Sequence, residues 1–146
     1  MKLYILNGPN LNMLGVREPE HYGQTTYEQL VDMVREHCET LGIECVCYQT
    51  NHEGALVDMI QEAYFEEADG IVINPGAYTH TSIAILDAAK SVKLPLVEVH
   101  ISNVQERESY RQVSYIREAA AKTISGHGVI GYIEAIDYLK GLLEEK

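Results

Sequence analysis

Short apolar runs alternate with longer amphipathic segments along almost the whole chain, and this alternation constrains the fold most. Runs of this length indicate buried strands, and the segments between them repeat apolar residues at helical spacing. Strands that alternate with helices form a parallel sheet covered on both faces. We therefore expect a three-layer α/β fold in a single domain of residues 1–146, with five strands at 3–6, 43–48, 71–73, 96–99 and 123–125.

The helices are expected between these strands. Thr26 and Gln29 are spaced as a capping box, which predicts a helix that begins there and ends at Gly42. The other expected helices cover residues 53–68, 82–92, 106–121 and 129–143. No linker, repeat or low-complexity tract interrupts the pattern, so the chain is expected to form one domain.

The formal net charge of −11 argues against nucleic acid as a partner, because nucleic-acid binding depends on clustered Lys and Arg. The net charge does not argue against a small anionic substrate. Salt screens the electric field of the whole protein beyond about 10 Å, so nearby arginines can dominate the charge of a pocket. No apolar run approaches the roughly 18–20 residues of a membrane span. Residues 1–6 are too short for a signal peptide, so we expect a cytoplasmic protein.

Three cysteines, Cys38, Cys45 and Cys47, match no metal-binding or redox pattern. Cys45 and Cys47 lie two residues apart in an expected strand and therefore share a face of the sheet. We interpret all three as reduced, mostly buried thiols rather than as catalytic groups.

Polar residues follow four of the expected strands at the edge where ligands bind in α/β sheets. Ligands of such sheets lie outside the carboxyl ends of the strands, near a topological switch point. Each of these turns carries Asn or His: residues 7–10, 49–52, 74–80 and 100–103. One Asn would be an ordinary helix cap, but four such turns together favour a binding site.

A polar segment bounded by Gly15 and Gly23 contains Arg17 and Tyr22, and we expect it to be a mobile lid. A free phenol has a pKa near 10, and lowering such a value to about 7 requires roughly 4 kcal/mol. One cation at 4 Å supplies about 1 kcal/mol in water but about 4 kcal/mol at an effective dielectric of 20. Tyr22 can therefore act as a base only when the lid closes over substrate with Arg17 beside it.

Glu98 and His100 lie two residues apart in an expected strand and so point to the same side. A Glu beside a His selects its tautomer and favours the charged imidazolium, which makes a general acid. The alternative is a structural histidine at a strand end. A second alternative is a metal site in which His80, Glu98 and His100 hold zinc. Phosphate-loop motifs are absent, and no lysine is placed for imine chemistry.

Several motifs together resemble the type II 3-dehydroquinate dehydratases (3-dehydroquinases) of the shikimate pathway. The resemblance runs nearly end to end and depends on residues 6–12 (LNGPNLN), 15–23 (GVREPEHYG), 51–54 (NHEG), 74–82 (NPGAYTHTS) and 98–103 (EVHISN). It implies a flavodoxin-like fold, no metal and no cofactor, and a dodecamer built as a tetramer of trimers. The implied reaction is the reversible anti elimination of water from 3-dehydroquinate, which gives 3-dehydroshikimate through an enolate.

The resemblance also assigns roles to residues of this chain. Tyr22 would be the proton acceptor, His100 the proton donor and Arg17 the stabiliser of the transition state. The expected substrate-binding residues are Ile101 and Ser102 for the carboxylate, Asn74, His80 and Arg111 for hydroxyl groups, and Asp87 reaching into a neighbouring subunit's site. Asn10 and Glu98 would support them.

Two positions and one segment depart from the family's pattern. Val113 stands where His is frequent, Arg117 stands where Ser is usual, and residues 122–125 are polar where Gly-Val-Ile is commoner. These departures lie beside the expected substrate and subunit contacts. The competing hypothesis is a non-catalytic protein of the same fold that binds a small anion; the presence of both Arg17 and Tyr22 argues against it.

Overall fold

A computed structural model describes residues 1–145 and contains one five-stranded sheet. Every neighbouring pair of strands is parallel, and their spatial order is β2-β1-β3-β4-β5, the order of flavodoxin. The strands are β1 (Lys2–Asn7), β2 (Glu44–Gln49), β3 (Gly70–Asn74), β4 (Leu96–His100) and β5 (Lys122–Ser125). The expected five-stranded parallel α/β sheet is confirmed.

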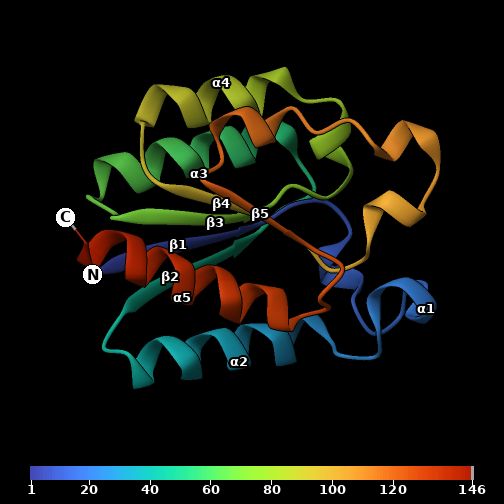
Figure 1. Cartoon of the computed structure of the whole chain (residues 1–146), viewed down its shortest axis with the longest axis horizontal. Coiled ribbons are helices and arrows are strands. Elements are labelled where there is room, and N and C mark those ends of the chain that lie inside the picture. Colours follow the sequence, from blue (N-terminus) through green and yellow to red (C-terminus); the bar gives the residue numbers. More distant parts are fainter. Residues whose placement is uncertain (146) are drawn as a thin grey trace.

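Helices cover both faces of the sheet, as predicted (Figure 1). One face is covered by α2 (Tyr27–Thr40) and α5 (Ile130–Glu144), and the other by α3 (Glu53–Phe65) and α4 (Ile83–Val92). A separate apolar cluster fills each interface between sheet and helices. Tyr132 and Leu30 are buried in the first cluster, and Ile60 and Ile85 in the second. The hydrophobic periodicity of the sequence thus reflects two distinct cores.

The capping box at Thr26 is present as predicted. Thr26 Oγ1 accepts a hydrogen bond from the Gln29 backbone N–H at 3.1 Å, and Gln29 Oε1 accepts one from the Thr26 N–H at 2.9 Å. A cap of this kind contributes roughly 1 kcal/mol. Gly42 has φ of 69° just after the helix, a conformation that residues with a Cβ rarely adopt.

The helix expected over residues 106–121 is wrong. Three short 3-10 turns occupy this region, at Val104–Glu106, Ser109–Arg111 and Ile116–Ala119. Tertiary contacts compete with helical hydrogen bonds here: the Gln112 side chain donates to the Val104 carbonyl at 2.7 Å, and the Tyr115 backbone N–H donates to the Thr79 carbonyl at 3.0 Å. The segment therefore folds back over the carboxyl ends of the strands.

The segment expected to be a lid contains one short helix, α1 (Pro19–Tyr22), which was not predicted. Proline at the first helical position is favoured because its missing N–H needs no partner there. Gly15 and Gly23 bound the segment with φ of 87° and 75°, and Glu18 also has a positive φ of 34°. These backbone conformations place α1 at the right-hand end of Figure 1, beside the carboxyl ends of the strands.

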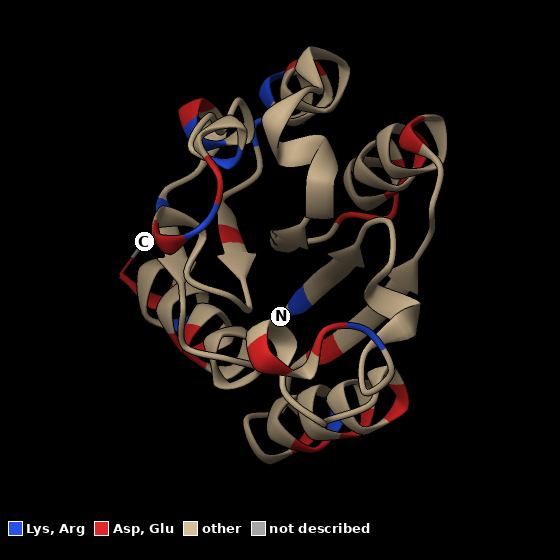
Figure 2. Cartoon of the chain, turned by 90° about the vertical axis from the view of Figure 1, so that its right-hand side faces the viewer, with Lys and Arg blue, Asp and Glu red and all other residues tan. Residues whose placement is uncertain are grey.

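The chain leaves the neighbouring strands β1 and β3 toward opposite sides of the sheet, which makes a topological switch point. Figure 2 looks onto this end, where Asp and Glu are more frequent than Lys and Arg on the surrounding elements. Gly8 and Pro75 pack closely across the crevice: a Cβ on Gly8 would lie 2.4 Å from the Pro75 carbonyl oxygen. Glycine is therefore required for the two turns to approach each other.

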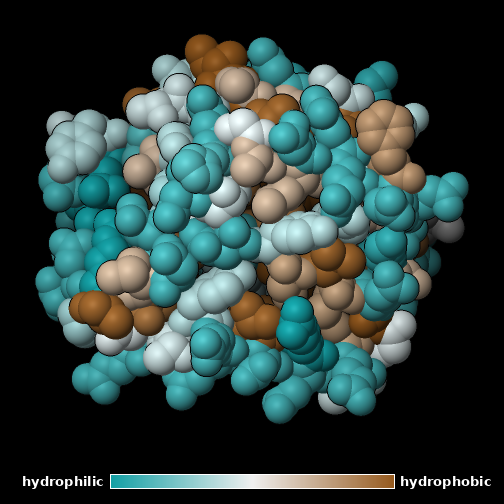
Figure 3. Space-filling view, turned by 180° about the vertical axis from the view of Figure 1, so that it is seen from behind, coloured by the Kyte–Doolittle hydropathy of each residue, from teal (hydrophilic) through white to brown (hydrophobic). Residues whose placement is uncertain are grey.

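The face of the molecule in Figure 3 is mostly hydrophilic. The face in Figure 3 shows apolar side chains in separate small groups among hydrophilic ones. Among residues 1–145, no helix combines the length and the apolar character needed to cross a membrane.

Candidate active site

A pocket lies at the carboxyl ends of β1, β3 and β4, beneath the lid. It encloses about 50 Å³. Most of the residues predicted from the sequence line it: Asn10, Arg17, Tyr22, Asn74, His80, His100, Ile101, Ser102 and Arg111. The structure thus brings together side chains from the lid, from three strand ends and from the 3-10 turn at Ser109–Arg111.

His100 and Glu98 form a buried pair, as their spacing in β4 indicates. His100 Nε2 donates a hydrogen bond to Glu98 Oε2 at 2.5 Å, and the two side chains are 6% and 0% exposed. Burial alone would raise the pKa of Glu98. Hydrogen bonds from His100 and Ser114, with the charges of His100 and Arg117, outweigh burial and lower this pKa to about 2. Glu98 is therefore an anion at neutral pH.

Three further donors complete the surroundings of the Glu98 carboxylate. Ser114 Oγ donates to Oε2 at 2.7 Å, and Thr123 Oγ1 donates to Oε1 at 2.9 Å. Arg117 Nε lies 3.3 Å from Oε1, and its side chain is 47% exposed. Glu98 does not line the pocket itself; it contacts the pocket through His100.

Tyr22 lies between two arginines. Arg107 Nη1 donates to the Tyr22 hydroxyl at 2.5 Å, whereas Arg17 Cζ lies over the ring, 4.5 Å from its centroid. The Arg107 side chain is 5% exposed, and its pKa is raised: burial opposes this, but the contact with Tyr22 and the charges of Glu108 and Glu18 prevail. Glu18 lies 3.6 Å from Arg17 and 3.9 Å from Arg107.

Arg107 was missed in the sequence because it falls in the segment interpreted as a helix. Its position in the sequence could have pointed to it. Arg107 follows soon after the end of β4, where the polar turn 100–103 already indicated a binding site. The expectation that Arg17 acts on the Tyr22 hydroxyl stays a prediction, and in this structure Arg107 makes the direct contact.

Asn74 is held in place by a buried hydrogen-bond chain. Its Nδ2 donates to the Tyr132 hydroxyl at 3.0 Å, and that hydroxyl donates to Asn7 Oδ1 at 2.5 Å. Asn74 Oδ1 accepts from the Gly76 backbone N–H at 3.1 Å. Because the amide has two Nδ2 protons, one of them has no partner among residues 1–145 and is available to a ligand.

His80 has a defined tautomer. Its Nδ1 donates to the Val113 carbonyl at 2.7 Å, and burial lowers its pKa, so the ring is neutral with Nε2 as an acceptor. Val113 contributes this contact through its backbone. The contact therefore does not depend on the kind of side chain at position 113. Arg111, also in the pocket, donates from Nε to Glu108 at 2.8 Å.

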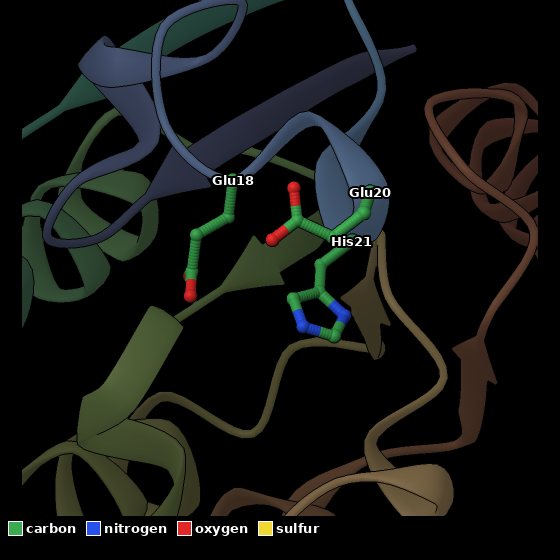
Figure 4. Close-up of side chains that lie close together, drawn as sticks. All are labelled: Glu18, Glu20 and His21. Atoms are coloured by element: carbon green, nitrogen blue, oxygen red, sulfur yellow. The ribbon is translucent and has the colours of Figure 1, made fainter.

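The proposed zinc ligands His80, Glu98 and His100 do not converge. In residues 1–145, ligand atoms of three suitable residues gather within 4.8 Å at one place, the exposed lid cluster of Glu18, Glu20 and His21 (Figure 4). Asp87 lies exposed on α4 and does not line the pocket of its own chain.

The cysteines lie outside the pocket. Burial raises the pKa of the Cys38 and Cys47 thiols to about 12, so both are protonated at neutral pH. This agrees with their interpretation as unreactive packing residues.

Comparisons with known proteins identify one family. The family model described as "Dehydroquinase class II" matches residues 1–140. A 3-dehydroquinate dehydratase from Clostridium perfringens is 50% identical, and the match covers 100% of both chains. The crystal structure of a type II dehydroquinase from Butyrivibrio crossotus has a TM-score of 0.95 and 56% identity, covering 96% of this chain and 97% of that chain. A type II dehydroquinase from Propionibacterium acnes has a TM-score of 0.92 and 38% identity, covering 96% of each chain.

Proposed function

The chain belongs to the class II dehydroquinase family, and we propose from this that it is a 3-dehydroquinate dehydratase. It removes water from 3-dehydroquinate by anti elimination and forms 3-dehydroshikimate through an enolate. The observation that carries the proposal is the presence, in one pocket, of a tyrosine beside arginines and a histidine beside a buried carboxylate. The elimination needs one base, one acid and stabilisation of the enolate, and these residues supply all three.

Tyr22 is the proposed base, which removes the proton alpha to the ketone. Its hydroxyl contacts the Arg107 guanidinium, and Arg17 lies over its ring. Both cations stabilise a phenolate, and they do so strongly only where water is excluded. Arg17 also stabilises the negative charge that develops on the enolate.

His100 is the proposed acid, which protonates the departing hydroxyl. Glu98 accepts a hydrogen bond from Nε2, which orients the ring and favours the imidazolium. Because Nε2 is engaged by Glu98, Nδ1 is the nitrogen that delivers the proton. Base and acid come from separate elements, the lid and β4, as an anti elimination requires of groups on opposite faces of the ring.

The remaining residues bind the substrate. Ile101 and Ser102 follow β4 directly, and their backbone N–H groups bind the substrate carboxylate. Asn74 offers its free Nδ2 proton to a hydroxyl, and neutral His80 accepts a hydrogen bond from another through Nε2. Arg111 completes the set, and Asn10 supports the wall of the pocket.

The lid opens for the substrate to enter. The enclosed volume of about 50 Å³ is far below the roughly 300–1,000 Å³ of pockets that hold small ligands. This small volume supports the proposal that the lid moves, and Tyr22 is held by Arg107 in the present arrangement. Gly15 and Gly23 are suited to act as hinges because their positive φ values are accessible without strain.

The assembly is proposed to be a dodecamer made of four trimers, located in the cytoplasm. Asp87 is exposed on α4 and is directed to a neighbouring subunit's site in this proposal.

The decisive experiment is to add 3-dehydroquinate and follow the ultraviolet absorbance of the conjugated enone product. We expect the absorbance to rise with the wild-type chain and to rise at a rate lower by orders of magnitude with Tyr22→Phe. Binding of 3-dehydroquinate without any product would instead support the non-catalytic alternative. Full activity after exhaustive chelation is also expected, and loss of activity restored by a divalent metal would contradict the mechanism.

A further inference from the structure

The Glu98 carboxylate is shared between two groups of donors, and one group lies outside the catalytic pocket. Oε2 accepts from His100 and Ser114, whereas Oε1 accepts from Thr123 of β5 and Arg117. Arg117 lies in the 3-10 turn Ile116–Ala119 and does not line the catalytic pocket. It lines a separate groove along the edge strand β5, together with Lys122.

A general acid that gives up its proton changes the charge balance of this buried site. Before the transfer, Glu98 faces a positively charged His100; afterwards, the same fully buried carboxylate faces a neutral imidazole. A buried ion without a charged partner is costly. Arg117 contributes a permanent positive charge at 3.3 Å from Oε1, and this charge does not depend on the proton of His100.

We propose that Arg117 is a positioning residue that acts through Glu98, keeping the carboxylate charged and oriented after His100 has donated its proton. The proposal depends on the assignment of His100 as the acid. Arg117 stabilises the state after proton transfer more than the state before it, because only in the later state is it the main cationic partner of Glu98. It therefore favours proton donation to the departing hydroxyl.

Other charged groups near the pair do not replace Arg117. His80 lines the same pocket as His100 and is neutral, Arg111 donates to Glu108, and Arg107 donates to Tyr22. Ser114 and Thr123 donate hydrogen bonds to Glu98 without carrying charge.

The test compares Arg117→Met, which keeps the aliphatic stem, with Arg117→Lys, which keeps the charge. We expect Arg117→Met to lower kcat for dehydration by about tenfold and to leave KM nearly unchanged. A loss of this size lies between the small cost of breaking an exposed ion pair and the large cost of breaking a buried one. The limb of the pH–rate profile that reports the acid moves to higher pH, because the carboxylate then holds the imidazolium more tightly. Arg117→Lys restores most of the activity. Lys122→Met is the matched control, since it removes a neighbouring cation of the same groove that does not contact Glu98, and it leaves kcat unchanged.

A double-mutant cycle with His100→Asn separates positioning from a structural role. If Arg117 acts through His100, adding Arg117→Met to His100→Asn lowers the residual kcat no further. An additional tenfold loss in that background overturns the proposal, as does an unchanged kcat in the single variant. Arg117→Gln, which also removes the charge but keeps a polar side chain, provides the same comparison where Arg117→Met does not fold. Absence of dehydration by the wild-type chain is a different result, because it overturns the proposed function itself.

Discussion

Replacing Arg107 by Met tests whether this arginine, absent from the sequence-based site, controls the base. Arg107 Nη1 lies 2.5 Å from the Tyr22 hydroxyl, and the arginine side chain is 5% exposed. Two unit charges 4 Å apart attract by about 1 kcal/mol in water and by about 4 kcal/mol at an effective dielectric of 20. A change of about 1.36 kcal/mol corresponds to a tenfold change in rate. If the buried Arg107 contributes about 4 kcal/mol, its loss lowers kcat roughly 10³-fold, whereas a solvated contact of about 1 kcal/mol would lower kcat only about fivefold.

The assay is steady-state dehydration of 3-dehydroquinate, followed by the enone absorbance across a range of pH. In Arg107→Met, the limb of the profile that reports the base should move to higher pH, since a phenolate loses its nearest cation. Arg35→Met is the control: Arg35 is exposed on α2, and its replacement changes the net charge by the same amount. Thermal unfolding of both variants shows whether the fold is retained.

A loss in kcat below tenfold, in a folded Arg107→Met protein, would refute the reasoning. The contact between Arg107 and the Tyr22 hydroxyl would then contribute little to the ionisation of Tyr22. An unshifted pH profile together with a raised KM would refute it in another way, because Arg107 would then act on substrate binding.

Four further outcomes are expected. Tyr22→Phe should leave substrate binding, measured by calorimetry, nearly intact while turnover falls by orders of magnitude; near-normal turnover would remove Tyr22 as the base. Because the pKa of Glu98 is lowered from 4.5 to about 2, the ionised carboxylate contributes about 3 kcal/mol of stability above pH 4.5 that is lost as the pH falls toward 2. Chemical denaturation should show this decline in the wild type and a smaller one in Glu98→Gln. Gly8→Ala should lower the free energy of unfolding by roughly 1–3 kcal/mol, because its Cβ would meet the Pro75 carbonyl, and an unchanged denaturation midpoint would contradict that packing. Borohydride with substrate should not inactivate the protein, because no lysine lines the pocket within residues 1–145; covalent trapping would indicate an imine mechanism.

Local signals in the sequence predicted the fold well. Thr26 and Gln29 are three residues apart, and their mutual capping depends on no distant part of the chain. The apolar runs of the strands are equally local, whereas the alternation with helices does not decide between the possible strand orders of such sheets. The segment 106–121 failed because its conformation is decided by distant partners, such as the Thr79 carbonyl that accepts from Tyr115. A periodicity argument contains no information about such contacts.

The difference between local signals and contacts with distant partners also explains how much of the site could be predicted. Residues at strand ends, such as Asn74 and His100, could be located because parallel strands bring their carboxyl ends to one edge. The pairing of Glu98 with His100 followed from their separation of two residues within a strand. Arg107, Ser114 and Arg117 could not be placed, since each reaches its partner through the irregular segment that the sequence pattern misjudged.

The irregular segment therefore has a functional reason to avoid a helix. A regular helix over residues 106–121 would point side chains outward around its axis and could not aim Arg107 at Tyr22 while Ser114 and Arg117 reach Glu98 on β4. Three short turns allow one segment to contact both the proposed base and the partner of the proposed acid. Substitutions that strengthen helix formation between Val104 and Ala119 are accordingly expected to reduce turnover before they reduce stability. They withdraw one cation from the proposed base and another from the partner of the proposed acid, while the two apolar cores on either side of the sheet stay intact.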